Sequence, residues 1–245
     1  HLAVLRNSAH GEELPFVILE PKQSRPQAVI WLDGQGKSAL FAGPENPSRP
    51  APAIEQLLHA GVTVLGADLL YQGEFLTNTL SLVQTRRVAN PREAAAYTFG
   101  YNHALFAQRV HDILSLIQFT RQHLPQLERL DLVGLNGAGP WAAAARAHSG
   151  RAIARLALDT GAFRFANITH LHDPDFLPGA VKYGDLPALL ALGAPGRLWV
   201  AGEPEGMPAL VSKTYRLAGA SKNLTLSRTK HGEIPAAAAA WLLKP

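Results

Sequence analysis

The sequence predicts an α/β fold: a mostly parallel sheet with helices on both faces. Short apolar runs typical of buried strands alternate with helix-like segments from about residue 28 onward, and no repeat or low-complexity linker divides the 245 residues. We expect residues 1–245 to form one α/β domain. Because the chain starts at His1 and not at methionine, we expect it to be processed or to be part of a longer protein.

Six apolar runs bounded by turn residues are expected to form buried strands. They cover residues 27–33, 62–68, 130–134, 154–159, 197–201 and 223–227. A further strand is expected over 14–20, and Pro15 places it at an edge, because proline has no N–H to donate to a second neighbour.

The clearest helix is expected over 103–123. Its apolar residues recur every three or four positions and so share one face: Phe106, Val110, Ile113 and Ile117. Shorter helices are expected at 53–60, 140–148, 186–192, 208–218 and 236–243, several of which begin near a proline. The two long connections, 71–102 and 160–184, are expected to form the rim of a pocket.

Composition excludes several classes of protein. The 23 basic and 19 acidic residues give a net charge of +4 and are interleaved, which indicates a solvated surface and no nucleic-acid partner. No apolar run approaches the roughly 20 residues of a membrane span. There is no cysteine, hence no disulfide or thiolate metal site, and His170-x-His172 lacks a third ligand motif, so we expect no metal.

The most informative segment lies between a predicted strand and a predicted helix. Gly134-Leu135-Asn136-Gly137-Ala138 occupies the G-x-S-x-G frame of a nucleophile elbow, in which small neighbours allow a sharp turn. Asn136 stands where the serine would be, and a neutral carboxamide cannot take the role of that serine. Asparagine does tolerate the left-handed backbone region, so it can keep the shape of the elbow.

Candidates for the other parts of a hydrolase site follow other strands. Asp33, Gly34 and Gln35 follow an early strand and, with Gly137, are expected to form an oxyanion or substrate loop. Glu203 follows a later strand as the candidate acid. His231 follows the last apolar run as the candidate base, which completes the order nucleophile, acid, base.

Nucleotide binding is the alternative to a hydrolase site. The glycines of Gly134–Gly139 resemble a dinucleotide loop, and Asp159 lies 20 residues beyond Gly139, where a ribose-binding acid belongs, but the first two glycines are one residue too far apart. Gly36-Lys37-Ser38 also resembles the end of a phosphate loop, yet Trp31 occupies the position that needs glycine.

With these residues placed, the chain resembles the α/β-hydrolase superfamily from about residue 14 to 245, and more narrowly its bacterial acetyl-xylan-esterase and dienelactone-hydrolase-like branch. The resemblance rests on 29–34 as oxyanion strand and loop, on 67–74, which resembles a D-x-x-x-x-G-E stretch, and on 101–112 as the helix before the elbow. It implies ester hydrolysis without a cofactor, a carbohydrate or small-ester ligand, and an exported or periplasmic protein.

The substitution at Asn136 leaves three explanations. The chain is a natural hydrolase-fold domain without serine-type hydrolysis, kept for binding or structure, with a second hydrolase domain in its parent protein. Alternatively, its nucleophile has been replaced by engineering. Or it is an active carboxylic-ester hydrolase that uses another group, for which Ser38 is the nearest hydroxyl to the predicted oxyanion loop.

Overall fold

The computed structural model describes residues 1–9, 11–43, 48–76, 82–85 and 98–245. Within them, eight strands form one sheet in the order β1-β2-β4-β3-β5-β6-β7-β8. Their bounds are β1 Leu2–Asn7, β2 Glu12–Leu19, β3 Gln27–Asp33, β4 Thr63–Ala67, β5 Arg129–Leu135, β6 Arg155–Asp159, β7 Arg197–Ala201 and β8 Leu224–Leu226. Pairing is parallel from β4 through β8 and antiparallel at β1 and β2. The predicted α/β class is confirmed.

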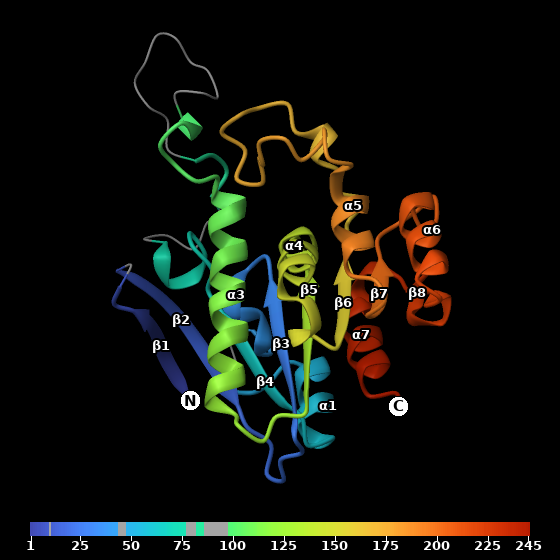
Figure 1. Cartoon of the computed structure of the whole chain (residues 1–245). Coiled ribbons are helices and arrows are strands. Elements are labelled where there is room, and N and C mark those ends of the chain that lie inside the picture. The colour runs from blue at the N-terminus through green and yellow to red at the C-terminus, as the bar shows by residue number, and fades with distance from the viewer. Residues whose placement is uncertain (10, 44–47, 77–81, 86–97) are drawn as a thin grey trace.

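Helices cover both faces of this sheet (Figure 1). The α-helices are α1 Pro52–His59, α3 Leu105–His123, α4 Gly139–Ser149, α5 Asp185–Leu192, α6 Ala209–Leu217 and α7 Ile234–Leu242. Helices α1 and α7 pack on one face, and α3, α4, α5 and α6 pack on the other. Alternate residues of the central strands therefore enter different cores: Ile30 packs beneath α3 and α4, whereas Trp31 packs with α1 and α7.

The strand at the edge of the sheet is not the one that the sequence predicts. The strand expected at the edge is β2, but β1, which the sequence did not indicate, pairs with it and takes the outer position. Pro15 is tolerated between two neighbours because it contributes its carbonyl, which accepts a hydrogen bond from Asp68 N at 2.9 Å. Leu2 and Val4 remain exposed, so β1 lacks the apolar signal that marks the other strands.

The two long connections meet beyond the carboxyl ends of the parallel strands. Residues 77–81 and 86–97 of the first connection lie outside the described residues. Its described part, including Tyr71 and Leu82, lines a cavity together with Pro174 and Asp175 of the second connection. The predicted rim is confirmed for these residues.

Candidate active site

The turn predicted at Asn136 is confirmed. Asn136 has a φ of 50° and joins the end of β5 to α4 within a few residues. Glycine is needed on both sides of the turn, since a side chain at Gly134 would overlap Ala142 and one at Gly139 would overlap the backbone of Asp159. Close packing of helix on sheet thus accounts for these two glycines without a nucleotide.

The carboxamide of Asn136 is bound to the loop after β3. Its Nδ2 donates to Asp33 Oδ2 at 2.6 Å, and Gln35 N donates to Asp33 Oδ1 at 2.9 Å. Asp33 is buried, and burial raises the pKa of its carboxyl group, although both hydrogen bonds act in the opposite direction. One carboxylate therefore ties the elbow to the predicted oxyanion loop.

That hydrogen-bonding pattern occupies donors that an oxyanion hole would need. An oxyanion hole requires two N–H groups that point at one developing negative charge. Here Gln35 N is bound to Asp33, and Gly34 N donates to Leu135 O at 3.2 Å. Among the predicted loop residues, Gly137 is the one whose N–H donates to no described residue.

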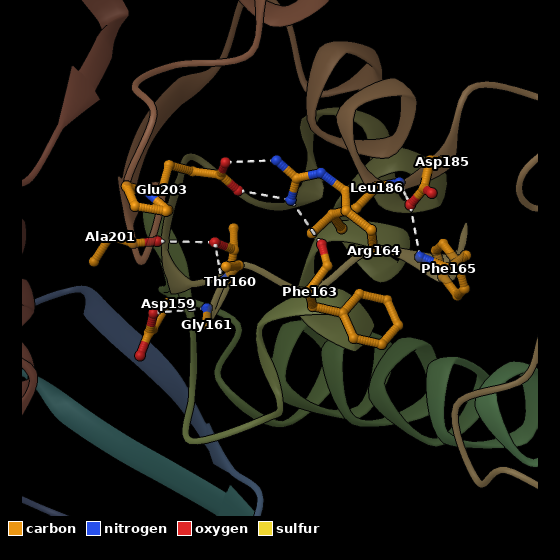
Figure 2. Close-up of polar contacts among 12 residues, drawn as sticks. Asp159, Thr160, Gly161, Phe163, Arg164, Phe165, Asp185, Leu186, Ala201 and Glu203 are labelled. Atoms are coloured by element: carbon orange, nitrogen blue, oxygen red, sulfur yellow. Dashed lines mark hydrogen bonds and ion pairs between the residues drawn. The ribbon is translucent and has the colours of Figure 1, made fainter. Parts of the chain in front are cut away.

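The structure does not bring Glu203 to His231. Glu203 is buried and accepts two hydrogen bonds from Arg164, at 3.0 and 2.6 Å, as Figure 2 shows. The imidazole of His231 is 80% exposed, and its Nδ1 lies 3.7 Å from Asp159 Oδ2. The carboxylate beside the predicted base is thus Asp159, which the sequence suggested only for nucleotide binding.

The loop that follows Asp159 is tied down by hydrogen bonds (Figure 2). Asp159 Oδ1 accepts from Gly161 N at 2.9 Å, and Asp185 accepts from the backbone of Phe165 at 2.8 Å. The bidentate contact with Glu203 raises the pKa of Arg164, as expected for a firmly held guanidinium. Sequence reasoning missed Arg164, because nothing in the sequence of this loop indicates which acid it would meet.

A cavity of about 720 Å³ opens beside Asn136. It is lined by Gly34, Gln35, Ser38, Tyr71, Gln72, Gly73, Leu76, Leu82, Arg109, Asn136, Gly137, Trp141, Pro174 and Asp175. His231 and Glu203 are not among these residues. Ser38 lines the cavity, but its hydroxyl donates to Gln35 O at 3.1 Å and forms no hydrogen bond with a described histidine.

The polar wall of the cavity is built around Arg109 of α3. Its guanidinium lies 4.4 Å from the centre of the Trp141 ring, and its Nε donates to Leu70 O at 3.1 Å. Trp141 Nε1 in turn donates to Asp175 Oδ1 at 2.6 Å, which leaves Arg109 Nη1 3.9 Å from that carboxylate oxygen. Neither terminal amino group of Arg109 donates a hydrogen bond to a described residue.

Burial opposes the charged forms of Arg109 and Asp175. It lowers the pKa of the Arg109 guanidinium and raises the pKa of the Asp175 carboxyl group. Tyr71, at the rim of the same cavity, has a φ of 59° and a ring that is partly exposed. This wall could not be predicted from the sequence, because Arg109 and Trp141 lie within the two expected helices 103–123 and 140–148 and nothing in the sequence brings them together.

Lys37 binds the two acidic residues of the stretch 67–74, on which part of the family resemblance rests. Its ammonium group pairs with both Asp68 and Glu74, while Asp68 also accepts from the backbone N–H groups of Lys37 and Glu74 at 2.8 and 3.0 Å. Lys37 is therefore engaged inside the protein and is not presented to a phosphate. Its role is to fix the loop after β3 against the loop after β4.

The charged side chains of the described residues form no metal-binding cluster. Among the described residues, no group of three or more histidine, aspartate or glutamate side chains is placed to hold an ion. His170 Nδ1 instead accepts from the backbone N–H of His172 at 3.1 Å. Within the same part of the chain, no helix combines the length and apolarity required to cross a bilayer.

Comparison with known proteins identifies the fold. No family model and no curated protein sequence matches the chain. Among solved structures it is similar to Est1E from Butyrivibrio proteoclasticus, with a TM-score of 0.55 and 13% identity over 99% of this chain and 97% of that one. It is also similar to a CE15 glucuronoyl esterase from Teredinibacter turnerae, with a TM-score of 0.57 and 16% identity over 99% and 73%.

A third structure is a thermostable carboxyl esterase from Bacillus coagulans, with a TM-score of 0.59 and 10% identity over 99% of this chain and 97% of that one. These matches extend over nearly the whole chain, and together with the eight-stranded, mostly parallel sheet flanked by helices they show that the chain has the α/β-hydrolase fold.

Proposed function

We propose that this chain is an α/β-hydrolase-fold domain that binds a small ester or carbohydrate ligand without serine-type hydrolysis. The hydrogen bond from Asn136 to Asp33 carries the proposal, because Asp33 also binds the N–H of Gln35. The position of the attacking oxygen and one half of the oxyanion hole are thereby engaged in a structural contact. In this proposal the domain serves an esterase-like parent protein as an accessory or binding unit.

The remaining hydrolase positions support the same proposal. Glu203 forms a buried ion pair with Arg164, and His231 is mostly exposed and does not line the cavity. A general base must come within hydrogen-bond reach of the proton that it removes. A histidine with a carboxylate beside it but no hydroxyl to activate supplies no turnover.

The cavity wall favours an uncharged ligand rich in hydroxyl groups. Arg109 and Asp175 lie too far apart to share a hydrogen bond, and burial disfavours the charge on each. A hydroxyl group that accepts from the guanidinium and donates to the carboxylate satisfies both groups. A carboxylate ligand would meet the negative charge of Asp175. The structural likeness to a glucuronoyl esterase is consistent with this chemistry.

Binding is tested by thermal shift and calorimetry with acetylated xylo-oligosaccharides. A ligand at 100 times its dissociation constant stabilises a protein by about 2.7 kcal/mol. We expect this stabilisation in the parent chain and its loss in Asp175→Ala, whereas Glu205→Ala, a change at an exposed acidic residue outside the cavity lining, retains it. Stabilisation by NAD, NADP or ATP instead would favour the nucleotide alternative.

Hydrolysis is tested with aryl acetates and acetylated xylan. We expect no turnover by the parent chain, since removal of a triad nucleophile costs on the order of a million-fold. Turnover by the parent that disappears in His231→Ala would overturn the proposal, and Ser38→Ala would then be the next variant. Asn136→Ser with and without His231→Ala shows whether the remaining groups can still act together.

A further inference from the structure

The sequence Asn136-Gly137 has a chemistry of its own that neither hydrolysis nor ligand binding uses. An asparagine followed by glycine can cyclise, because the backbone nitrogen of the glycine attacks the side-chain carbonyl carbon and no side chain on glycine hinders the attack. Asn136-Gly137 is the single Asn-Gly pair in the 245 residues. It lies at the point of the fold where a hydrolase carries its nucleophile.

The local structure leaves the attacking atom available. Gly137 lies between β5 and α4, and its N–H donates to no described residue, whereas the next N–H, that of Ala138, is bound to Leu135 O at 2.9 Å. Asn136 and Gly137 are both exposed and both line the cavity, so water reaches them. A helix or strand hydrogen bond, the usual protection against this reaction, is thus missing at this peptide.

A proton carrier is already in contact with the leaving group. Asn136 Nδ2 lies 2.6 Å from Asp33 Oδ2, and Asp33 is buried. In its protonated form, which burial favours, the carboxyl group held at this nitrogen can deliver the proton that lets the amide nitrogen depart as ammonia, and the resulting carboxylate regains a proton from solvent as Gly137 N loses its own. The hydrogen bond to Asp33 also holds the carboxamide in one orientation.

We infer that Asn136 is a self-modification site at which the fold promotes conversion of the carboxamide to a carboxylate. The bond from Gly137 N to Asn136 Cγ forms, the bond from Cγ to Nδ2 breaks, and Nδ2 leaves as ammonia with the proton from Asp33, while solvent takes the proton lost by Gly137 N. Water then opens the succinimide ring, adding its hydroxyl to a ring carbonyl and its hydrogen to the ring nitrogen. Opening at one carbonyl yields aspartate and at the other isoaspartate.

The product differs from the starting chain in the chemistry of the elbow. A carboxylate at position 136 would face the carboxylate of Asp33 at hydrogen-bond distance. Two such groups cannot both ionise freely, so they share a proton and titrate as a pair. A carboxylate, unlike a carboxamide, also belongs to the groups that form covalent intermediates in enzymes. The modification would therefore replace an inert group with a nucleophile.

The test is incubation of the full folded chain at neutral pH, followed by peptide mapping and an assay of released ammonia. We expect one equivalent of ammonia per chain and the amide-to-acid mass change confined to the peptide that holds Asn136. The same chain unfolded in urea gives the rate at which Asn136-Gly137 converts without the influence of the fold. A folded chain that converts more slowly than the unfolded one would show that the fold protects Asn136, which overturns the inference.

Two variants test the parts assigned to Asn136 and Asp33. Asn136→Gln keeps a carboxamide but needs a larger ring, so its conversion should be lost. Asp33→Asn removes the proton carrier and should slow the folded chain several-fold while leaving the rate in urea unchanged; an equal folded rate would contradict the part assigned to Asp33. Circular dichroism checks that both variants fold. None of these readouts depends on ester hydrolysis or on ligand binding, so the proposed function stands or falls separately.

Discussion

The two ends of the parallel strands use charged side chains in opposite ways. At the carboxyl ends, aspartates that end or directly follow strands accept hydrogen bonds from backbone N–H groups of the next loop: Asp33 from Gln35, Asp68 from Glu74 and Asp159 from Gly161. At the amino ends, arginines that begin strands donate to backbone carbonyls at and beyond the end of α7: Arg129 to Leu242, Arg155 to Leu242 and Lys244, and Arg197 to Pro245.

The difference concerns which backbone groups remain open to a ligand. Buried backbone groups need partners, and both ends supply them with charged side chains. At the amino ends of the strands, these hydrogen bonds hold residues 242–245 against the sheet. At the carboxyl ends it occupies N–H groups, among them that of Gln35, that a hydrolase would leave open for an oxyanion. Loop fixation and hydrolysis therefore compete for the same donors.

The largest expected loss of stability is at the carboxyl ends, in Lys37→Met. The variant leaves Asp68, whose side chain is 2% exposed, without its cation. Removing one partner of a buried ion pair costs about 3 to 5 kcal/mol. Urea denaturation measures this loss, and Lys213→Met on the exposed side of α6 is the matched control.

A second control neutralises the buried charge of Asp68, which Lys37→Met leaves without a partner. Lys37→Met with Asp68→Asn should recover part of the stability, because the buried negative charge is then absent. A loss no larger than that of Lys213→Met would show that the carboxyl-end loops do not depend on buried charge.

A smaller loss is expected at the amino ends, in Arg155→Met. The substitution leaves the carbonyls of Leu242 and Lys244 with fewer donors, and a buried group without its partner costs about 1 to 3 kcal/mol. Hydrogen exchange should quicken in α7 while α4, which follows the elbow, keeps its protection. Arg151→Met, at an exposed arginine four residues before Arg155, is the control. Equal loss of protection at both ends would show that they are not independent.

Stability should also depend on pH through Asp112, which lies on α3. Burial raises the pKa of this carboxyl to about 6 from an ordinary value of 3.8, although a hydrogen bond from Leu70 N opposes the rise. Between these two values the folded chain binds more protons than the unfolded chain, so stability falls as pH rises from about 4 to about 6. A shift of this size amounts to roughly 2 to 3 kcal/mol.

Asp112→Asn should reduce that slope in urea titrations and leave the part that Asp131 contributes, because burial raises the pKa of Asp131 to about 6 as well. Asp173→Asn, on the loop that follows β6, serves as the control and should leave the slope as it is in the parent chain. A slope that is unchanged in Asp112→Asn would assign the whole titration to Asp131 and other carboxyl groups.

The sequence predicted much of the sheet and the elbow because both depend on local patterns. Apolar runs mark strands that are buried on both faces, and Gly134 and Gly139 mark a turn where backbones approach closely. The partners of Glu203 and His231 did not follow from the sequence, because the order along the chain gives the strand that a residue follows but not where its side chain points. Arg164 and Asp159, which are ordinary in sequence, determine those contacts.

The smallest expected effect is that of Glu203→Gln. The substitution removes one charge of a bidentate pair, but Arg164 is 29% exposed, so solvent screens the interaction and the expected cost is about 1 kcal/mol. Glu205→Gln, two residues away and exposed, is the matched control. The difference between the two variants should shrink as salt is added, since ions screen the partly exposed pair.

The effect of Glu203→Gln on turnover distinguishes two roles for Glu203, as the ion-pair partner of Arg164 or as the acid that serves His231. If Asn136→Ser gains turnover, adding Glu203→Gln should leave it unchanged, because Asp159 is the acid near His231. Adding Asp159→Asn should reduce it, since His231 then loses its carboxylate partner. Turnover that depends on Glu203 but not on Asp159 would require Glu203 to leave Arg164 for His231. That outcome would show that the fixed loops at the carboxyl ends of the strands can rearrange for chemistry.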